Sequence, residues 1–335
     1  MKQYLLFVLL ILSLLKNTAV YAQHTGKETT HMFRIYEDND FLNITGNGTD
    51  NSYTNGLQFD YFYSKNHPSR FFIDRWMPTA GRNSVNIYSW SIAQLMVTPN
   101  DITTTQYQPD DYPYAGALFT THSLYSYNAE KKYSFQTDVV AGIRGPASFS
   151  REFQTWFHSV INYDKPEGWN NQLSTFPLVN INFRAEKQLW AVGNFIELIG
   201  GSQVQAGSFV DAFSIYPLLR IGKMAPYFDG YFSRYGSYYR NGRKMKTQFY
   251  FVLKPENTFV LHNALLHGKR TNEDDYPGIE KAGVRGIRHR LTDIQYGAVL
   301  SHGNFGFSYL QTHSTEYNQG LYHHNWGNVS LYYKW

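Results

Sequence analysis

The sequence predicts an all-β protein, a transmembrane antiparallel β-barrel of about twelve strands with one short helix in an extracellular loop. Three observations predict this fold: segments that alternate apolar and polar residues, a high aromatic content, and an alternating strand at the C-terminus. Tyr, Phe and Trp make up 18% of the chain, whereas charged residues make up 17%. Because aromatic side chains gather where a barrel meets the membrane interface, this composition favours a membrane barrel.

The alternation is clearest in residues 178–187. Val179 and Ile181 lie on one face of this segment, while Asn180 and Arg184 lie on the other. A soluble sandwich rarely buries Arg on its inner face, so we expect the polar face to line a wet lumen and the apolar face to contact lipid. The same alternation recurs in residues 57–63, 133–139 and 249–253.

The last strand alternates through Val329, Leu331, Tyr333 and Trp335. It resembles the C-terminal assembly signal of bacterial outer-membrane proteins, although a soluble sandwich can also end on a strand. Thirteen segments read as strands, and a barrel with both termini on the periplasmic side needs an even number, so one segment is split, missed or over-counted. They are residues 31–41, 53–64, 86–97, 113–126, 132–143, 176–187, 193–205, 208–221, 246–254, 257–267, 289–301, 303–314 and 326–335.

We expect the miscounted strand between residues 193 and 245, where the aromatic-rich piece YFDGYFSRYGSYYRNGRK reads as either strand or loop. The long connections are expected to face outward from the cell, as they do in bacterial outer-membrane barrels. They cover residues 42–52, 98–112, 145–172, 222–245 and 268–287.

Residues 1–22 read as a secretory signal peptide, because Lys2 precedes an apolar run and the segment ends in the small-residue spacing of Val20 to Ala22. Residues 23–335 then form one barrel domain. Without Lys2 and Lys16 the chain has 28 basic and 26 acidic residues, so nothing indicates nucleic acid, and no protein partner is implied. Cysteine is absent, which excludes disulfides and thiolate metal sites.

One stretch, residues 145–173, differs from the alternating strands around it. Apolar residues recur in it at three- and four-residue spacing, which predicts an amphipathic helix of about four turns. His158 falls just past the edge of the apolar arc, with Gln154 one turn before it. A lone His on a helix is most often solvated or packed, so its significance depends on other residues.

Residues 37–55 are rich in side-chain oxygens, including Glu37, Asp38, Asn39 and Asp40. Carboxylate and amide oxygens without His or Cys suit Ca²⁺ better than a transition metal. The spacing of an EF-hand is absent, and a plain polar extracellular loop remains an alternative. No GxSxG nucleophile motif occurs in the chain.

Six short blocks occur in one order over residues 36–173, and together they resemble the outer-membrane lipid A 3'-O-deacylase family. The second half of the chain resembles that family mainly in its barrel character. The blocks are EDNDF at 37–41, SYTNG at 52–56, PDDYPYAG at 109–116, GPAS at 145–148, QTWFH at 154–158 and GWNNQL at 168–173.

This resemblance implies a Ca²⁺-dependent esterase of the bacterial outer membrane that removes the 3'-linked acyloxyacyl chain from lipid A of the outer-leaflet lipopolysaccharide. The family site lies between the barrel wall and a helix of an extracellular loop. Family roles transfer to Asn39 and Asp40, to Thr54 and to His158, which would be the general base. Asp40, with Asn39 and Thr54, would supply oxygen to the metal.

The family also uses an acidic residue shortly after the His. Asp164 and Glu167 both qualify, and the spacing favours Asp164. Tyr112 stands where family members commonly carry Arg, so a phosphate contact from that position is in question. The register also leaves a choice: Asn39 and Asp40 alternate, so either the strand bulges at the rim or one side chain points into the lumen.

Two other classes of function remain open at this stage. One is a non-catalytic barrel, a small porin or a lipid-binding protein, which needs only the wall. The other is a barrel phospholipase that acts on glycerophospholipids.

Overall fold

The computed structural model describes residues 31–44, 52–65, 69–240, 243–268 and 287–335. The signal peptide predicted at residues 1–22 lies outside these ranges. None of the described helices is long and apolar enough to cross a membrane.

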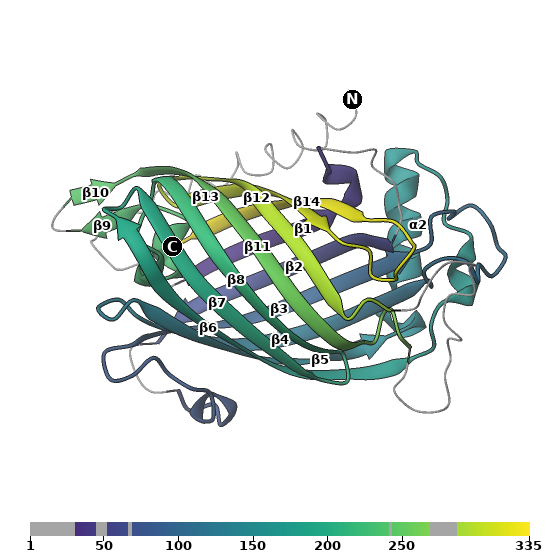
Figure 1. Ribbon diagram of the computed structural model, residues 1–335, viewed down its shortest axis with the longest axis horizontal. Coiled ribbons are helices and arrows are strands. Elements are labelled where there is room, and N and C mark those ends of the chain that lie inside the picture. Colours follow the sequence, from purple (N-terminus) through teal and green to yellow (C-terminus); the bar gives the residue numbers. More distant parts are fainter. Residues whose placement is uncertain (1–30, 45–51, 66–68, 241–242, 269–286) are drawn as a thin grey trace.

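Twelve antiparallel strands close into a barrel, which confirms the predicted fold class (Figure 1). Neighbouring strands follow chain order except that β8 pairs with β11, and β1 pairs with β14 to close the sheet. The strands are β1 (His31–Asn39), β2 (Ser52–Ser64), β3 (Val85–Thr98), β4 (Ala115–Asn128), β5 (Tyr133–Arg144), β6 (Phe176–Val192), β7 (Ile196–Gly207), β8 (Val210–Lys223), β11 (Thr247–Asn263), β12 (Arg290–His302), β13 (Phe305–Ser314) and β14 (His324–Lys334).

The remaining elements lie in the connections. A separate two-stranded sheet joins β9 and β10. These elements are η2 (Asp40–Leu42), η3 (Ile73–Arg75), η4 (Pro146–Ser148), α2 (Ser150–Ile161), η5 (Gly168–Asn171), η6 (Tyr227–Asp229), α3 (Tyr231–Arg234), β9 (Tyr238–Arg240) and β10 (Arg243–Met245).

The prediction of about twelve strands is confirmed, and the thirteenth candidate segment arose because one strand was split. The candidates 246–254 and 257–267 are a single strand, β11, so the error did not lie between residues 193 and 245. Pro255 and its charged neighbours interrupt the apolar pattern in the middle of β11. Pairing with β8 is recorded up to Leu253 and again from Asn257, so the missing N–H of Pro255 falls in a gap in that ladder.

The two ends of the barrel differ, and we name one after the chain termini and the other after helix α2. At the termini end, the backbone N–H of His31 donates to the carbonyl of Trp335. At the opposite, helix end lies α2 (Figure 1). Because neighbouring strands alternate in direction, the connections alternate between the ends, and residues 224–240 and 243–246 belong to the termini end. The prediction that the long connection 222–245 faces outward was therefore wrong.

Residues 224–237, which we call the plug, fold into the lumen at the termini end. Met224, Ala225 and Phe228 are fully buried, and the Arg234 guanidinium lies 4.1 Å from the ring centroids of both Tyr227 and Tyr231. A cation over aromatic faces away from water is a stabilising arrangement. The plug therefore has a core of its own inside the barrel.

Strands on opposite sides of the barrel hold the plug, which places it within the lumen. The Tyr227 hydroxyl donates to the Glu186 carboxylate of β6 at 2.9 Å. The Gln248 amide of β11 donates to the carbonyl of Ser233 at 2.7 Å, and the Lys334 ammonium of β14 donates to the carbonyl of Phe232 at 2.9 Å. The Phe62 ring of β2 packs against Tyr231.

A plugged lumen has a direct electrical consequence. We expect the protein in a planar lipid bilayer to show no open-channel steps, because aromatic and hydrogen-bonded side chains fill the path for ions. A variant in which a Gly-Ser linker replaces residues 226–237 is expected to conduct, and it serves as the positive control. Porin-like conductance of the unmodified protein would contradict the closed lumen and favour the porin alternative.

Candidate active site

Helix α2 packs on the outer face of the barrel wall. Met96 of β3 has the same strand parity as Trp90 and Ile92, which are 43% and 52% exposed on the outer face. Met96 is buried in a cluster with Trp169, and Phe153 of α2 packs against that cluster. The predicted amphipathic helix therefore buries part of its apolar side against the outside of the wall.

Close approach to β4 fixes the start of the helix. A Cβ atom on Gly116 would lie 2.1 Å from the Ser150 hydroxyl oxygen, so only glycine lets α2 reach the strand. The backbone N–H of Gly145 donates to the carbonyl of Gly116 at 2.8 Å, and the Gln94 side chain donates to the carbonyl of Ser148 at 2.6 Å. The GPAS and PYAG blocks of the sequence meet at this contact.

The segment after the helix returns to the same wall. The backbone N–H of Leu173 donates to the carbonyl of Tyr114 at 2.8 Å. The Trp169 indole donates to the side-chain oxygen of Gln154 at 2.7 Å, which explains why this polar residue at the helix edge is buried. Residues 145–173 thus form one closed unit on the outer face.

His158 lies in the last turn of α2 and is 4% exposed. Its Nδ1 is 2.5 Å from the main-chain oxygen of Asp164. A carbonyl oxygen can only accept, so Nδ1 carries the proton and Nε2 of the neutral ring carries the lone pair. Asn162, with φ of 55°, ends the helix and turns the chain back toward the ring. The ring is therefore oriented for Nε2 to act as a base.

The two candidates for the acidic partner are placed differently. Asp164 contacts the His158 ring through its main-chain oxygen, while its side chain is exposed. Glu167 is 40% exposed, and its carboxylate lies 3.1 Å from the Lys165 ammonium. Asp164, which the spacing favours, therefore orients the His158 ring, but it does so through its main-chain oxygen and not through its carboxylate.

The Asn39–Asp40 pair stands where β1 ends. Asn39 is the last residue of the strand and caps η2, because its side-chain oxygen accepts from the N–H of Phe41 at 2.9 Å. Asp40 begins η2 and is 5% exposed. The open question about the register is answered by this turn: β1 pairs regularly with β2 through Asn39 and does not bulge, and the chain changes direction at Asp40.

The bulge lies instead in β2, at Thr54. Its pairing with β3 shifts register between Tyr53 and Asn55, and the Thr54 hydroxyl lies 2.7 Å from that of Thr98. Bulges re-aim side chains at barrel rims. Asn55, whose side chain donates to the Glu37 carboxylate, was missed as a candidate although it belongs to the SYTNG block.

One row of paired residues connects the two groups. Asn39 pairs with Asn55, Asn55 with Met96, and Met96 with Gly116, across four consecutive strands. Directly paired residues share a face, and neighbouring strands lie about 4.8 Å apart. Asn39 is therefore roughly 10 Å from the residue that packs under α2, on the same face and at the same end of the barrel.

The predicted donors fit a hard cation chemically. Asp40 offers a carboxylate, Asn39 an amide oxygen and Thr54 a hydroxyl, which are the oxygen ligands that Ca²⁺ accepts. Asp40 is buried, so a cation beside it would compensate for the desolvation of its charge. Within the described ranges no three His, Asp or Glu residues gather as a metal cluster, and this donor set holds a single acid.

Tyr112, the position that departs from the family pattern, contacts the connection between β13 and β14. Its ring packs edge-on against Tyr322, and its hydroxyl accepts from the N–H of Asn318 at 3.2 Å. Burial raises the pKa of the Tyr112 hydroxyl above its ordinary value, so it stays neutral. The residue packs the loop 315–323 at the helix end.

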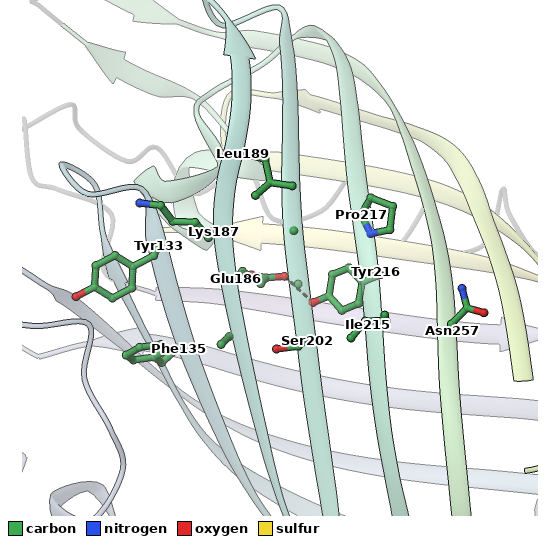
Figure 2. Close-up of a pocket in the computed structure, with 13 residues that line it drawn as sticks. Tyr133, Phe135, Glu186, Lys187, Leu189, Ser202, Ile215, Tyr216, Pro217 and Asn257 are labelled. Atoms are coloured by element: carbon green, nitrogen blue, oxygen red, sulfur yellow. Dashed lines mark hydrogen bonds between the residues drawn. The ribbon is translucent and has the colours of Figure 1, made fainter. Parts of the chain in front are cut away.

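A pocket of about 680 Å³ opens elsewhere on the wall (Figure 2). Its lining includes Tyr133, Phe135, Lys187, Leu189 and Pro217, and none of the predicted site residues. It lies over β5 to β8 and the adjacent β11, so it is separate from the site at α2.

A closed twelve-stranded barrel with a helix held on its outer face defines an outer-membrane β-barrel protein. The family model described as outer membrane protein LpxR matches residues 5–335. The chain therefore belongs to the LpxR family, which confirms the resemblance to the outer-membrane lipid A 3'-O-deacylase family and the location in the bacterial outer membrane.

The solved structure of one family member has the same fold. The chain is similar to LpxR from Salmonella typhimurium, with 16% identity, a TM-score of 0.69, and coverage of 90% of this chain and 99% of that one. The beta domain of the Bordetella autotransporter BrkA matches at 8% identity with a TM-score of 0.44, over 92% of this chain and 99% of that one. No curated protein matches the chain significantly.

Proposed function

We propose that the protein is a carboxylic ester hydrolase that removes the 3'-linked acyloxyacyl chain of lipid A. The observation that carries this proposal is the buried His158, whose Nδ1 lies 2.5 Å from a main-chain oxygen so that Nε2 bears the lone pair. Family membership supplies the substrate class, and the position of α2 on the outer face gives a membrane lipid access to the site.

Ester hydrolysis without a nucleophilic serine requires an activated water and stabilisation of the oxyanion. His158 takes the proton of the attacking water at Nε2 and then returns it to the leaving alkoxide. The Asp164 carbonyl keeps the ring in that tautomer throughout, and its hydrogen bond to Nδ1 strengthens when the ring becomes positive. No covalent acyl-enzyme intermediate forms.

Asp40, Asn39 and Thr54 are the residues that would hold Ca²⁺ in this proposal. A bound Ca²⁺ supplies positive charge to polarise the ester carbonyl. The Asn39 cap and the hydrogen bond between Thr54 and Thr98 fix the directions of two of these donors before substrate arrives. Preorganised donors of this kind lower the cost of reorganisation during the reaction.

The outer side of α2 suits an acyl chain. Trp156 and Val160 are 56% and 54% exposed there, and Phe149 just before the helix is 62% exposed. When exposed apolar side chains contact an acyl chain, apolar surface is removed from water, which is favourable. We infer that this side contacts the acyl chains of the surrounding lipid, while the ester to be cleaved reaches the opposite, wall-facing side of α2, where His158 lies.

Mass spectrometry of lipid A from cells with and without the gene tests the proposal. We expect the protein to reduce the mass of lipid A by one acyloxyacyl group at the 3' position. Unchanged lipid A together with new lysophospholipids would favour the phospholipase alternative. Unchanged lipid A and unchanged phospholipids would favour a non-catalytic barrel.

A further inference from the structure

The connection between β2 and β3 folds back along the outside of the barrel. Residues 69–84, which we call the return loop, contain η3 and lie at the termini end (Figure 1). Met77 of the loop is buried against Tyr88 and Leu124. Those two residues are paired and have the outer-face parity of Trp90, so the loop covers part of the lipid-facing wall.

A buried contact between Asp74 and His122 fixes the middle of the return loop. One oxygen of the Asp74 carboxylate lies 2.6 Å from Nε2 of His122 in β4, and the two side chains are 2% and 3% exposed. The Lys65 ammonium lies 3.4 Å from the other oxygen. Asp74 is the one acid in residues 69–84, and its carboxylate faces the barrel. The charged side chains that the return loop exposes are therefore all basic.

Hydrogen bonds at Ala80 fix the second half of the return loop. Its N–H donates to the Ser126 hydroxyl of β4 at 2.8 Å. Its carbonyl accepts from the Tyr133 hydroxyl of β5 at 2.6 Å and from the Asn128 side chain at 3.2 Å. The loop therefore presents a defined surface.

That surface is aromatic and basic. Trp76 is 86% exposed and Phe72 is 64% exposed. Arg70 and Arg75 are also exposed. Trp and Phe with nearby Arg match a membrane interface, where aromatic rings sit at the headgroup level and guanidinium groups bind phosphate.

We propose that the return loop is a phospholipid-binding anchor in the periplasmic leaflet. Phe72 and Trp76 lie among the glycerol and upper acyl region, and Arg70 and Arg75 bind the lipid phosphates. The periplasmic leaflet is the partner because short turns and the chain termini of bacterial outer-membrane barrels face the periplasm. The anchor is independent of the hydrolase activity at the opposite end.

Depth measurement by spin-label spectroscopy tests the position of the loop. The chain has no cysteine, so Trp76→Cys can carry a single nitroxide in the full-length protein in liposomes. We expect collisions with oxygen to exceed those with a water-soluble nickel complex, as for Ile181→Cys on the lipid face. Asn304→Cys, in a tight turn at the same end, provides the aqueous reference. A probe at position 76 that behaves like the one at 304 would overturn the proposal and indicate a soluble partner.

Lipid retention tests the phosphate contacts. We expect the Arg70→Gln/Arg75→Gln variant to retain less phosphatidylglycerol in native mass spectrometry, by about fivefold for each arginine. The Arg290→Gln variant, changed at the helix end, is expected to retain as much as the unmodified protein. Equal retention in the double variant and the control would overturn the assignment of Arg70 and Arg75.

Discussion

Replacing His158 with alanine is expected to lower the rate of lipid A deacylation by about 10²–10⁴-fold, the usual effect of losing a general base. His158 is buried, its Nδ1 is held by the main chain at residue 164, and alanine has no group that can accept the proton of the attacking water. The rate is measured as release of fatty acid from lipid A by the purified protein in detergent micelles.

The barrel itself should survive this change, because His158 belongs to α2 and not to the wall. Heat-modifiable migration on gels reports the folded barrel and is expected to stay unchanged. His323, which is 71% exposed in a loop at the same end, provides the matched control as His323→Ala. If His158→Ala still releases the 3' chain at the original rate, His158 is not the base.

Removing calcium is expected to have the second large effect. With EGTA present, deacylation should fall to the background rate, and added Ca²⁺ should restore it, because neutral donors alone stabilise an oxyanion poorly. Asp40→Asn removes the single carboxylate of the proposed donor set. We expect this variant to need about tenfold more Ca²⁺ for half-maximal activity, since ligand charge sets the affinity for the ion.

Asp101→Asn tests whether Asp40 has a particular role. Asp101 lies in an exposed loop at the helix end, where its carboxylate accepts from the N–H and hydroxyl of Thr103. This variant should keep the calcium dependence of the unmodified protein. Activity that is indifferent to EGTA would contradict a role for the metal, whereas equal shifts in both variants would contradict the assignment to Asp40.

Much of the fold can be predicted from the sequence because the wall obeys a local rule. Each strand must turn alternate residues to lipid, so Val179 and Ile181 are exposed while Asn180 is buried. The plug obeys no such rule. Tyr227 is buried against Glu186 of β6 and Arg234 against Tyr125 of β4, strands distant in the sequence, although the aromatic and basic composition of the plug matches that of a surface loop.

The candidate site was predictable as a set of residues but not as an arrangement. The sequence blocks pointed to His158 and to the Asn39–Asp40 pair, and the resemblance related them to one another. The pairing register then placed Asn39 in one row with Met96 and Gly116, which no periodicity predicts. The His158 ring contacts the main-chain oxygen of Asp164, which every residue type has, so the sequence could not predict this contact.

The most direct test of the central claim is the mass of lipid A from otherwise identical cells that carry an empty vector, the unmodified gene or the His158→Ala gene. We expect only the unmodified gene to remove the 3'-linked acyloxyacyl group, while both proteins reach the outer membrane in equal amounts. Lipid A that keeps all its chains in every strain, or that loses the 3' chain equally with both genes, would contradict this expectation.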